Sequence, residues 1–175
     1  MQLNRIVGAI DFSDVSLVSL EVALNLTIGS DATLYLLHVL ETHAGIDPIC
    51  GWISPSDVDQ QEKAMERLSS LGPETLQRDV RIERDVLIGS PVKETARFAQ
   101  EKGAEMIVVG THGRRGLTRA LMGSTAEGLL REAPCQVLVV KPQFAARQDT
   151  RRPLISHNLR QAGALPQLLG RRGLR

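Results

Sequence analysis

The sequence predicts an α/β fold in which helices cover both faces of a single, doubly wound parallel sheet of five strands. Five short apolar runs alternate with four helical segments along residues 1–142, and this βαβαβαβαβ order requires crossover connections. The run at residues 33–39 (TLYLLHV) is apolar on both faces, as strands are when helices lie on each side of the sheet. Hydrophobic residues make up 42% of the chain and aromatic residues only 3%, which predicts one domain with an aliphatic core.

The amino-terminal half begins with a strand and a capped helix. Residues 3–10 (LNRIVGAI) are an apolar run that ends at Asp11. Ser13 or Asp14 can cap the following helix, whose apolar positions keep helical spacing until Gly29. After the strand at residues 33–39, residues 41–55 show no period and contain two prolines and two glycines, which predicts a long loop.

The remaining elements alternate in the same way. Residues 58–71 predict a polar, charged helix, and the alternating pattern of residues 80–87 (VRIERDVL) predicts a strand near an edge of the sheet. Pro91 suits the first position of the next helix, because the amide that proline lacks has no partner there. The last expected elements are that helix, ending at Gly103, a strand at residues 106–109 (MIVV), a helix opening near Gly123, and a strand at residues 137–140 (VLVV).

Charge divides the chain into two parts. Residues 143–175 contain seven arginines and one aspartate, giving +6, so residues 1–142 must carry −5 to reach the net charge of +1. We therefore expect a compact acidic domain at residues 1–142 and a basic, flexible tail at residues 143–175. Nucleic acid or another anionic partner is an open alternative for the arginines of the tail. Since no apolar run is long enough to span a membrane and the amino terminus does not resemble a signal peptide, we expect a cytoplasmic protein.

Glycines and hydroxyl residues after the fourth strand predict a phosphate cradle. Glycines let the backbone approach an anion, and the unpaired amides at a helix start attract it. The sequence has neither the lysine of a P-loop nor the G-x-G-x-x-G pattern of dinucleotide-binding proteins. The alternative is that these glycines only shape a strand-to-helix connection. The residues concerned are Gly110, Gly113, Gly123, Ser124 and Thr125.

Three further residues are assigned structural roles. His38, near the end of the second strand, is expected to be a buried and hydrogen-bonded ring. Cys135 directly precedes the last strand and is interpreted as a small buried hydrophobic residue. Gly128 lies inside a helix, where glycine costs about 1 kcal/mol, and we expect close packing against a neighbouring strand to explain it.

The spacing Gly110, Gly113, Gly123-Ser124 resembles the motif G-x2-G-x9-G-[S/T] of the universal stress protein family, in its ATP-binding subgroup. Further matching segments are the opening IVGAIDFSD, the LHV that ends the second strand, the G-S-P before the third helix, and CQVLVVKP. This resemblance covers nearly all of residues 1–142. It implies the adenine nucleotide alpha hydrolase-like fold, with strand order 3-2-1-4-5.

The resemblance also assigns residues to a nucleotide. It implies that Asp11 faces the ribose or the base edge, that the backbone of Val39 contacts the adenine, and that Ala9 lies in the same site. Asp11 has an alternative role in capping the first helix. Arg114, Arg115 and Arg119 lie between the glycines and can either neutralise phosphate charge or form a solvated basic loop. Magnesium is expected only together with ATP, because it commonly binds substrate phosphates.

These observations favour a nucleotide-binding regulatory protein over an efficient enzyme, and the resemblance implies a role in the stress response. The sequence presents no general base and no P-loop lysine for phosphoryl transfer. Two alternatives stay open: a slow ATPase or phosphotransferase, and a dimeric scaffold that binds no nucleotide. The resemblance implies a homodimer in which the strand that begins at Val137 and ends at Val140 pairs with its counterpart.

Overall fold

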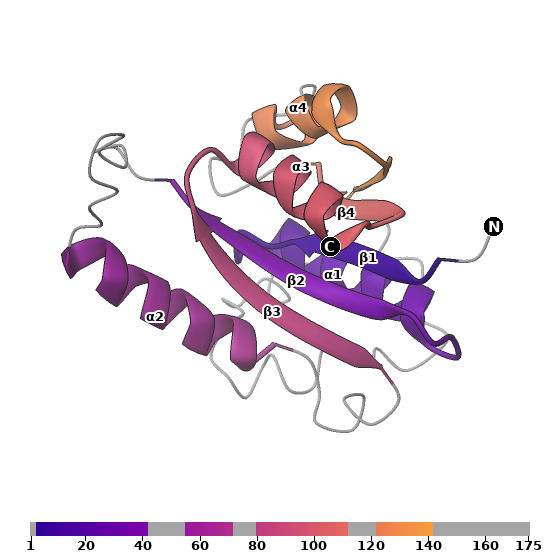
Figure 1. Ribbon diagram of the computed structural model, residues 1–175, viewed down its shortest axis with the longest axis horizontal. Coiled ribbons are helices and arrows are strands. Elements are labelled where there is room, and N and C mark those ends of the chain that lie inside the picture. The colour runs from indigo at the N-terminus through magenta and orange to yellow at the C-terminus, as the bar shows by residue number, and fades with distance from the viewer. Residues whose placement is uncertain (1–2, 42–54, 72–79, 112–121, 142–175) are drawn as a thin grey trace, which may run out of the picture.

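A computed structural model describes residues 3–41, 55–71, 80–111 and 122–141 of the chain (Figure 1). Strands and helices alternate along these residues, as predicted. The elements are β1 (Arg5–Ala9), α1 (Asp14–Thr27), β2 (Thr33–Leu40), α2 (Pro55–Ser69), β3 (Arg81–Ile88), α3 (Pro91–Lys102), β4 (Met106–Gly110), α4 (Ser124–Glu132) and β5 (Gln136–Val140). Most of the loop predicted at residues 41–55, and the whole predicted tail at residues 143–175, lie outside the described residues.

All five strands form one parallel sheet in the order β3-β2-β1-β4-β5. This confirms the order that the family resemblance implied. It also confirms that β3 is an edge strand of the described sheet, as its alternating sequence predicted. Strands β2 and β3 lie on one side of β1, and strands β4 and β5 lie on the other side, so the strand order reverses between β1 and β4. These two strands lie side by side, with Gly8 opposite Val108.

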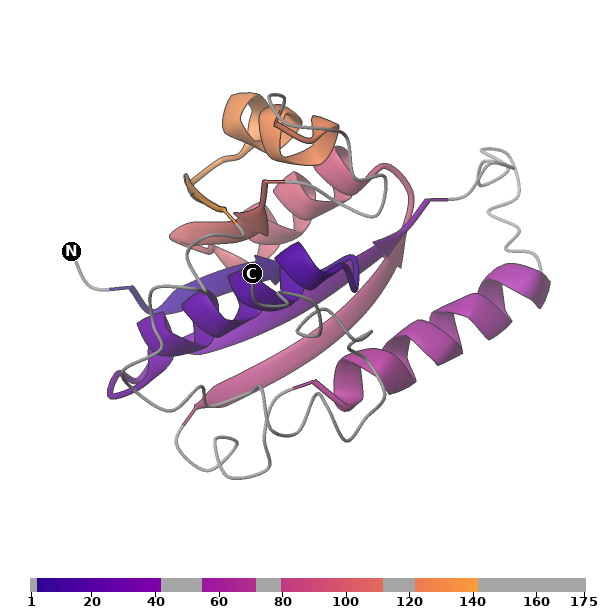
Figure 2. The same ribbon diagram turned by 180° about the vertical axis from the view of Figure 1, so that it is seen from behind.

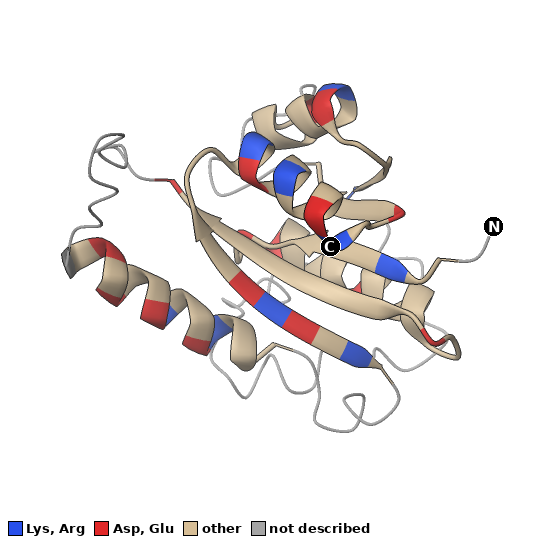
Figure 3. Cartoon of the chain, in the orientation of Figure 1, with Lys and Arg blue, Asp and Glu red and all other residues tan. Residues whose placement is uncertain are grey.

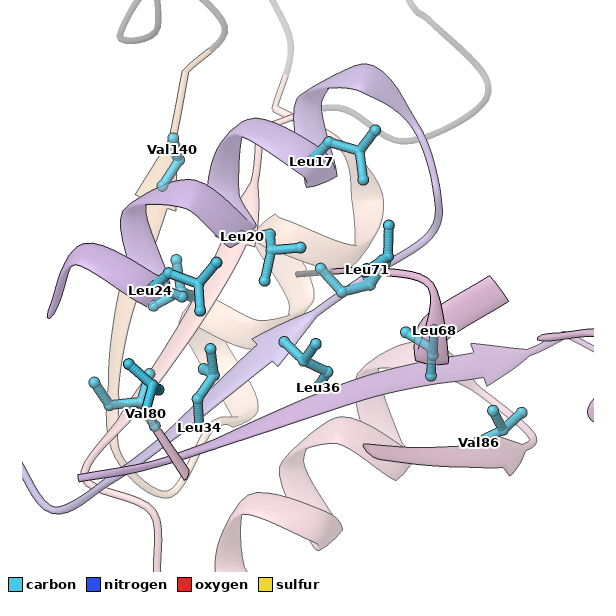
Figure 4. Close-up of a cluster of buried hydrophobic side chains, with 14 of the residues drawn as sticks. Leu17, Leu20, Leu24, Leu34, Leu36, Leu68, Leu71, Val80, Val86 and Val140 are labelled. Carbon is cyan, nitrogen blue, oxygen red and sulfur yellow. The ribbon is translucent and has the colours of Figure 1, made fainter. Parts of the chain in front are cut away.

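The helices cover the sheet in two pairs, α1 and α2 on one face and α3 and α4 on the other (Figures 1 and 2). Figure 4 shows Leu17, Leu20 and Leu24 of α1 in a buried cluster with side chains of the strands and of α2. Their helical spacing is what places all three on the buried face of α1. Burial of each such leucine contributes about 2 kcal/mol, so an aliphatic cluster holds α1 on this face of the sheet.

Helix ends follow the chemistry of the sequence. Ser13 caps α1, its side chain accepting a hydrogen bond from the amide of Ser16. Gly103 ends α3 in the left-handed conformation that glycine adopts without strain (φ +60°). None of the described helices combines the length and apolar character needed to cross a membrane.

Gly128 is explained by a neighbouring helix, and not by a strand as expected. A Cβ at this position would lie 2.6 Å from Cγ2 of Val92, which belongs to α3. The missing side chain therefore lets α4 approach α3 closely. The sequence indicated that close packing was needed but not which element supplied it.

Cys135 is only partly buried and packs against the cluster under α3 and α4. Burial raises the pKa of its thiol above the ordinary value, and the nearby negative charge of Glu105 raises it further. Cys135 therefore packs against hydrophobic residues as predicted, but it is less buried than expected.

The two edge strands of the described sheet differ in charge, and Figure 3 shows the charged residues along β3. Four of the eight residues of β3 are charged, namely Arg81, Glu83, Arg84 and Asp85, whereas β5 (QVLVV) has no charged residue. Charged side chains on an edge strand oppose pairing with another sheet. The two edges are therefore chemically unequal.

Glu105 joins the beginnings of β1 and β4. Its carboxylate accepts hydrogen bonds from the backbone amides of Asn4 (3.2 Å) and Arg5 (2.6 Å), and it forms an ion pair with the guanidinium of Arg5 (3.5 Å). Partial burial raises the pKa of this carboxyl, but the two amides and the Arg5 charge outweigh it, so the pKa lies below its ordinary value of 4.5. The ionised form is therefore favoured by folding.

Glu105→Gln is expected to lower stability at pH 7 and to be nearly neutral in acid. A lowered folded-state pKa gives stability that is present above the unfolded value of 4.5 and is lost as the pH falls through the folded value. Because both Arg5 and Glu105 are partly exposed to solvent, we expect a difference of about 1 kcal/mol or less at pH 7. Urea unfolding of both proteins at pH 7 and pH 3 measures it. A gap of equal size at both pH values would contradict the assignment.

Candidate functional site

The candidate site lies at the carboxyl edge of the sheet, beside the β1–β4 boundary. Ala9 is the last residue of β1, Gly110 is the last residue of β4, and Val39 is the next-to-last residue of β2. Since the strands are parallel and β1 lies between β2 and β4, these three residues reach the same edge. The point where the strand order reverses is where open α/β sheets bind ligands. The fold therefore brings together residues that the sequence keeps far apart.

Asp11 organises the turn between β1 and α1. Its Oδ1 accepts hydrogen bonds from the backbone amide of Ser13 (3.0 Å) and from the Ser13 hydroxyl (2.6 Å). Ser13, and not Asp11, is the capping residue of α1. A carboxylate can accept about four hydrogen bonds, which suits Asp11 to organising a turn. The capping alternative is thus fulfilled by Ser13, and the ligand role of Asp11 stays a prediction.

Gly110 lets α1 begin directly on the end of β4. A Cβ at this position would lie 2.8 Å from Cγ1 of Val15 and 3.2 Å from both the carbonyl carbon and the oxygen of Val15. The first contact is closer than real Cβ atoms come, and the two backbone contacts are tight, so a side chain at this position would force Val15 to shift. Gly110 therefore has a packing role of its own, and that packing brings the Asp11 turn close to the end of β4.

Thr111 joins the two ends of the predicted cradle. Its backbone amide donates to the carbonyl of Val140 (2.9 Å), and its carbonyl accepts from the amide of Gly123 (2.6 Å). Residues 112–121, between these ends, lie outside the described residues. The backbone bond thus places the start of α4 beside the end of β4. Thr111 is buried, and our sequence interpretation overlooked it, although its place directly after Gly110 was an available signal.

The first turn of α4 supplies backbone donors. Gly123 is the N-cap residue, and Ser124 and Thr125 are the first two residues of the helix. The first amides of a helix have no acceptor within it, and the helix dipole is positive at this end, so an anion is favoured there. Gly123 has an ordinary backbone conformation (φ −62°, ψ 147°), so its own dihedral angles do not require glycine.

The other predicted cradle residues lie outside the described residues. They are Gly113, Arg114, Arg115 and Arg119. Within the described part of the chain, no group of three histidine, cysteine, aspartate or glutamate side chains could hold a metal ion.

An aromatic pair lies beside the Asp11 turn. His38 is only 3% exposed, and its Nδ1 is 2.6 Å from the carbonyl oxygen of Ile10, which confirms the predicted buried and satisfied ring. The ring of Phe12 packs on it with 4.6 Å between centroids. Arg67 of α2 lies over the Phe12 ring, 4.0 Å from its centroid. Sequence analysis identified neither Phe12 nor Arg67, because nothing local marks a contact between such distant residues.

Residues 2–141 match the model of the universal stress protein family. The chain belongs to the universal stress protein family. A universal stress protein of Methanocaldococcus jannaschii is 36% identical over 142 residues, which cover 79% of this chain and 82% of that relative. The family assignment therefore rests on most of the chain, including both ends of the predicted cradle.

Solved structures share the fold of this universal stress protein. The protein UspA of Lactobacillus plantarum superposes with a TM-score of 0.62 at 22% identity, over 80% of this chain and 99% of that one. A universal stress protein of Archaeoglobus fulgidus, solved in complex with dAMP, superposes with a TM-score of 0.56 at 22% identity, over 79% and 98% of the two chains. At this level of identity the likeness establishes the fold.

Gly110→Ala is expected to lower the free energy of unfolding by about 2 kcal/mol, the usual cost of overpacking. The added methyl would meet Val15 at both its side chain and its backbone. Adding Val15→Ala should restore only part of the loss, because the backbone contacts at 3.2 Å remain. Urea unfolding measures all three proteins.

Gly8→Ala is the matched control. The atom nearest to its Cβ would be Cδ2 of Leu36, at 3.3 Å, which is the end of a side chain and not part of the backbone. This substitution should cost less than Gly110→Ala. Equal losses at the two glycines, or complete rescue by Val15→Ala, would show that the backbone of α1 does not rest on Gly110.

Proposed function

We propose that this universal stress protein binds ATP together with Mg²⁺ at the carboxyl edge of its sheet. The observation that carries the proposal is the hydrogen bond from the Gly123 amide to the Thr111 carbonyl (2.6 Å). This bond holds the start of α4 beside the end of β4, at the edge of the sheet where Asp11 follows β1. A helix start that favours anions then lies at the same edge as a carboxylate suited to sugar hydroxyls.

The proposed roles follow the chemistry of each group. Asp11, Ala9 and the backbone of Val39 would contact the nucleoside. Backbone amides and hydroxyls of Gly110, Gly113, Gly123, Ser124 and Thr125 would hold the phosphates. Mg²⁺ would be bound through those phosphates, as is usual for this ion. The dAMP bound to the related Archaeoglobus fulgidus protein supports an adenine nucleotide as the ligand.

We further propose that the bound nucleotide serves regulation in the cytoplasmic stress response. Backbone amides and the hydroxyls of Ser124 and Thr125 can hold a phosphate group, but neither is a general base at neutral pH. Such a site favours occupancy over turnover. A change in affinity for other proteins on ATP binding would then be the signal.

Isothermal titration with Mg-ATP tests the binding, using the purified protein and Gly123→Val. The valine side chain would project at the start of α4, and we expect affinity to fall at least tenfold. The supernatant of heated protein should also contain a co-purified adenine nucleotide for the wild type and much less for the variant.

Gly29→Ala provides the control, because Gly29 has φ +76° with open space around it, so alanine adds backbone strain without a clash. Gly29 follows α1 at the opposite edge of the sheet, and its variant should lose stability but keep ATP affinity. If the wild-type protein neither binds ATP nor carries a nucleotide, the proposed function is wrong.

We also propose a homodimer through the strand β5. The absence of charge on this edge strand, against four charged residues on β3, favours pairing at β5. Gln136 and Val140 direct backbone groups toward β4, since the Gln136 amide donates to the Glu105 carbonyl and the Val140 carbonyl accepts from Thr111. Backbone groups alternate along a strand, so those of Val137 and Val139 face the outer edge.

Val139→Pro is expected to convert the dimer to a monomer, because it removes an outward-facing amide while leaving the hydrogen bonds to β4 in place. Val139→Ala keeps that amide and should remain dimeric. Light scattering coupled to gel filtration measures both masses. A monomeric wild-type protein at micromolar concentration would refute the proposed dimer.

A further inference from the structure

Three side chains form a stack beside the proposed nucleotide site. The guanidinium of Arg67 lies 4.0 Å from the centroid of the Phe12 ring, and that ring lies 4.6 Å from the His38 ring. His38 is in turn 2.6 Å from the carbonyl oxygen of Ile10 through its Nδ1. The stack therefore connects α2, on the surface, with the two residues on either side of Asp11.

Phe12 has a backbone conformation that its residue type rarely adopts. Its φ is +62°, and it is the one described residue other than glycine with a positive φ. A bulky aromatic residue persists in this conformation only where its surroundings hold it. Here the ring is held between Arg67 and His38. The left-handed turn at Phe12 is what allows Ser13 to fold back and donate two hydrogen bonds to the Asp11 carboxylate.

Arg67 is positioned by the way α2 is attached to β3. The Arg84 side chain of β3 donates from Nε to the carbonyl of Leu68 (3.0 Å) and from Nη2 to the carbonyl of Leu71 (3.0 Å). Gln61 of α2 donates to the carbonyl of Val86 (2.9 Å). The two Arg84 bonds fix the carboxyl end of α2, where Arg67 lies, and the Gln61 bond holds the middle of the helix. The hydrogen bonds between α2 and β3 thus determine where the exposed Arg67 side chain lies relative to Phe12.

We propose that Arg67 and Phe12 are positioning residues for the nucleotide site, which hold the Asp11 carboxylate in the orientation that binds the nucleoside. This inference rests on the proposed ATP binding and extends it to α2, which supplies none of the proposed nucleotide contacts. Because coupling between two sites is reciprocal, nucleotide binding would also strengthen the attachment of α2 to the turn. The carboxyl end of α2 is then a surface whose attachment to the turn changes when the nucleotide binds.

Arg67→Ala is expected to weaken binding of Mg-ATP about two- to fivefold, the factor that corresponds to one exposed cation–π contact. Arg67→Lys, which keeps the cation but not the planar group, should recover part of that loss. Lys63→Ala is the matched control, because Lys63 lies one turn earlier on α2 and pairs with Asp59 (2.6 Å). It should leave affinity unchanged. Isothermal titration measures all four proteins.

A double-mutant cycle with Phe12→Gly tests whether Arg67 acts through the ring. Glycine adopts a positive φ without strain, so this variant removes the ring while permitting the turn. In the Phe12→Gly protein, Arg67→Ala should cause no further loss of ATP affinity. Without nucleotide, Arg67→Ala should shift the ¹H–¹⁵N signals of Asp11 and Ser13, and Lys63→Ala should leave them in place.

The outcomes separate this inference from the function on which it rests. Wild-type protein that binds no ATP refutes the proposed function, whatever the variants do. ATP binding that is lost in Gly123→Val but unchanged in Arg67→Ala, with unmoved Asp11 and Ser13 signals, refutes the positioning role alone. Losses that add fully in the double mutant show that Arg67 does not act through Phe12, and overturn the inference as well.

Discussion

The arrangement of this protein depends on how closely the first turn of α1 approaches the end of β4. At Gly110 a Cβ would lie only 2.8 Å from the Val15 side chain and 3.2 Å from the Val15 backbone, so a side chain there would force Val15 to shift. Because α1 starts so near β4, the turn that carries Asp11 is brought to the β1–β4 boundary. The Thr111 backbone then joins that boundary to β5 and to the start of α4. A packing constraint between a helix and a strand thus assembles the candidate site.

The same constraint changes how the glycine motif is understood. Gly110 is needed for packing even before any ligand is considered, and Gly128 is needed because α4 meets Val92 of α3. Gly123, with its ordinary dihedral angles, has no such conformational reason. The glycines of one segment therefore serve different purposes. The two interpretations from the sequence, phosphate cradle and structural turn, are compatible. At Gly110 the packing role concerns the missing side chain, whereas the proposed phosphate contact concerns the backbone amide.

The helix α2 is attached to the sheet differently from the other helices. Its buried face is short, with Ala64 and Leu68 as its fully buried hydrophobic residues. Polar side chains join the middle of α2 and its carboxyl end to β3 through backbone carbonyls. Hydrogen bonds of this kind contribute about 1 kcal/mol each and have strict geometry. They therefore define the position of α2 more than they stabilise it, and that position brings Arg67 to the ring beside Asp11.

The sequence by itself determined the elements and their character. Apolar runs of strand length, the Ser13 cap and Gly103 are local signals, and each element that they predicted is present with nearly the predicted bounds. Family resemblance supplied the strand order, which periodicity alone does not determine. Only the tertiary structure decided that Val15 rests on Gly110, that Thr111 binds Gly123, that Gly128 meets a helix, and that Arg67 lies over a left-handed Phe12. The physical reason is that propensity and periodicity act within a few residues, whereas these contacts join distant segments and form only when the sheet has packed against its helices.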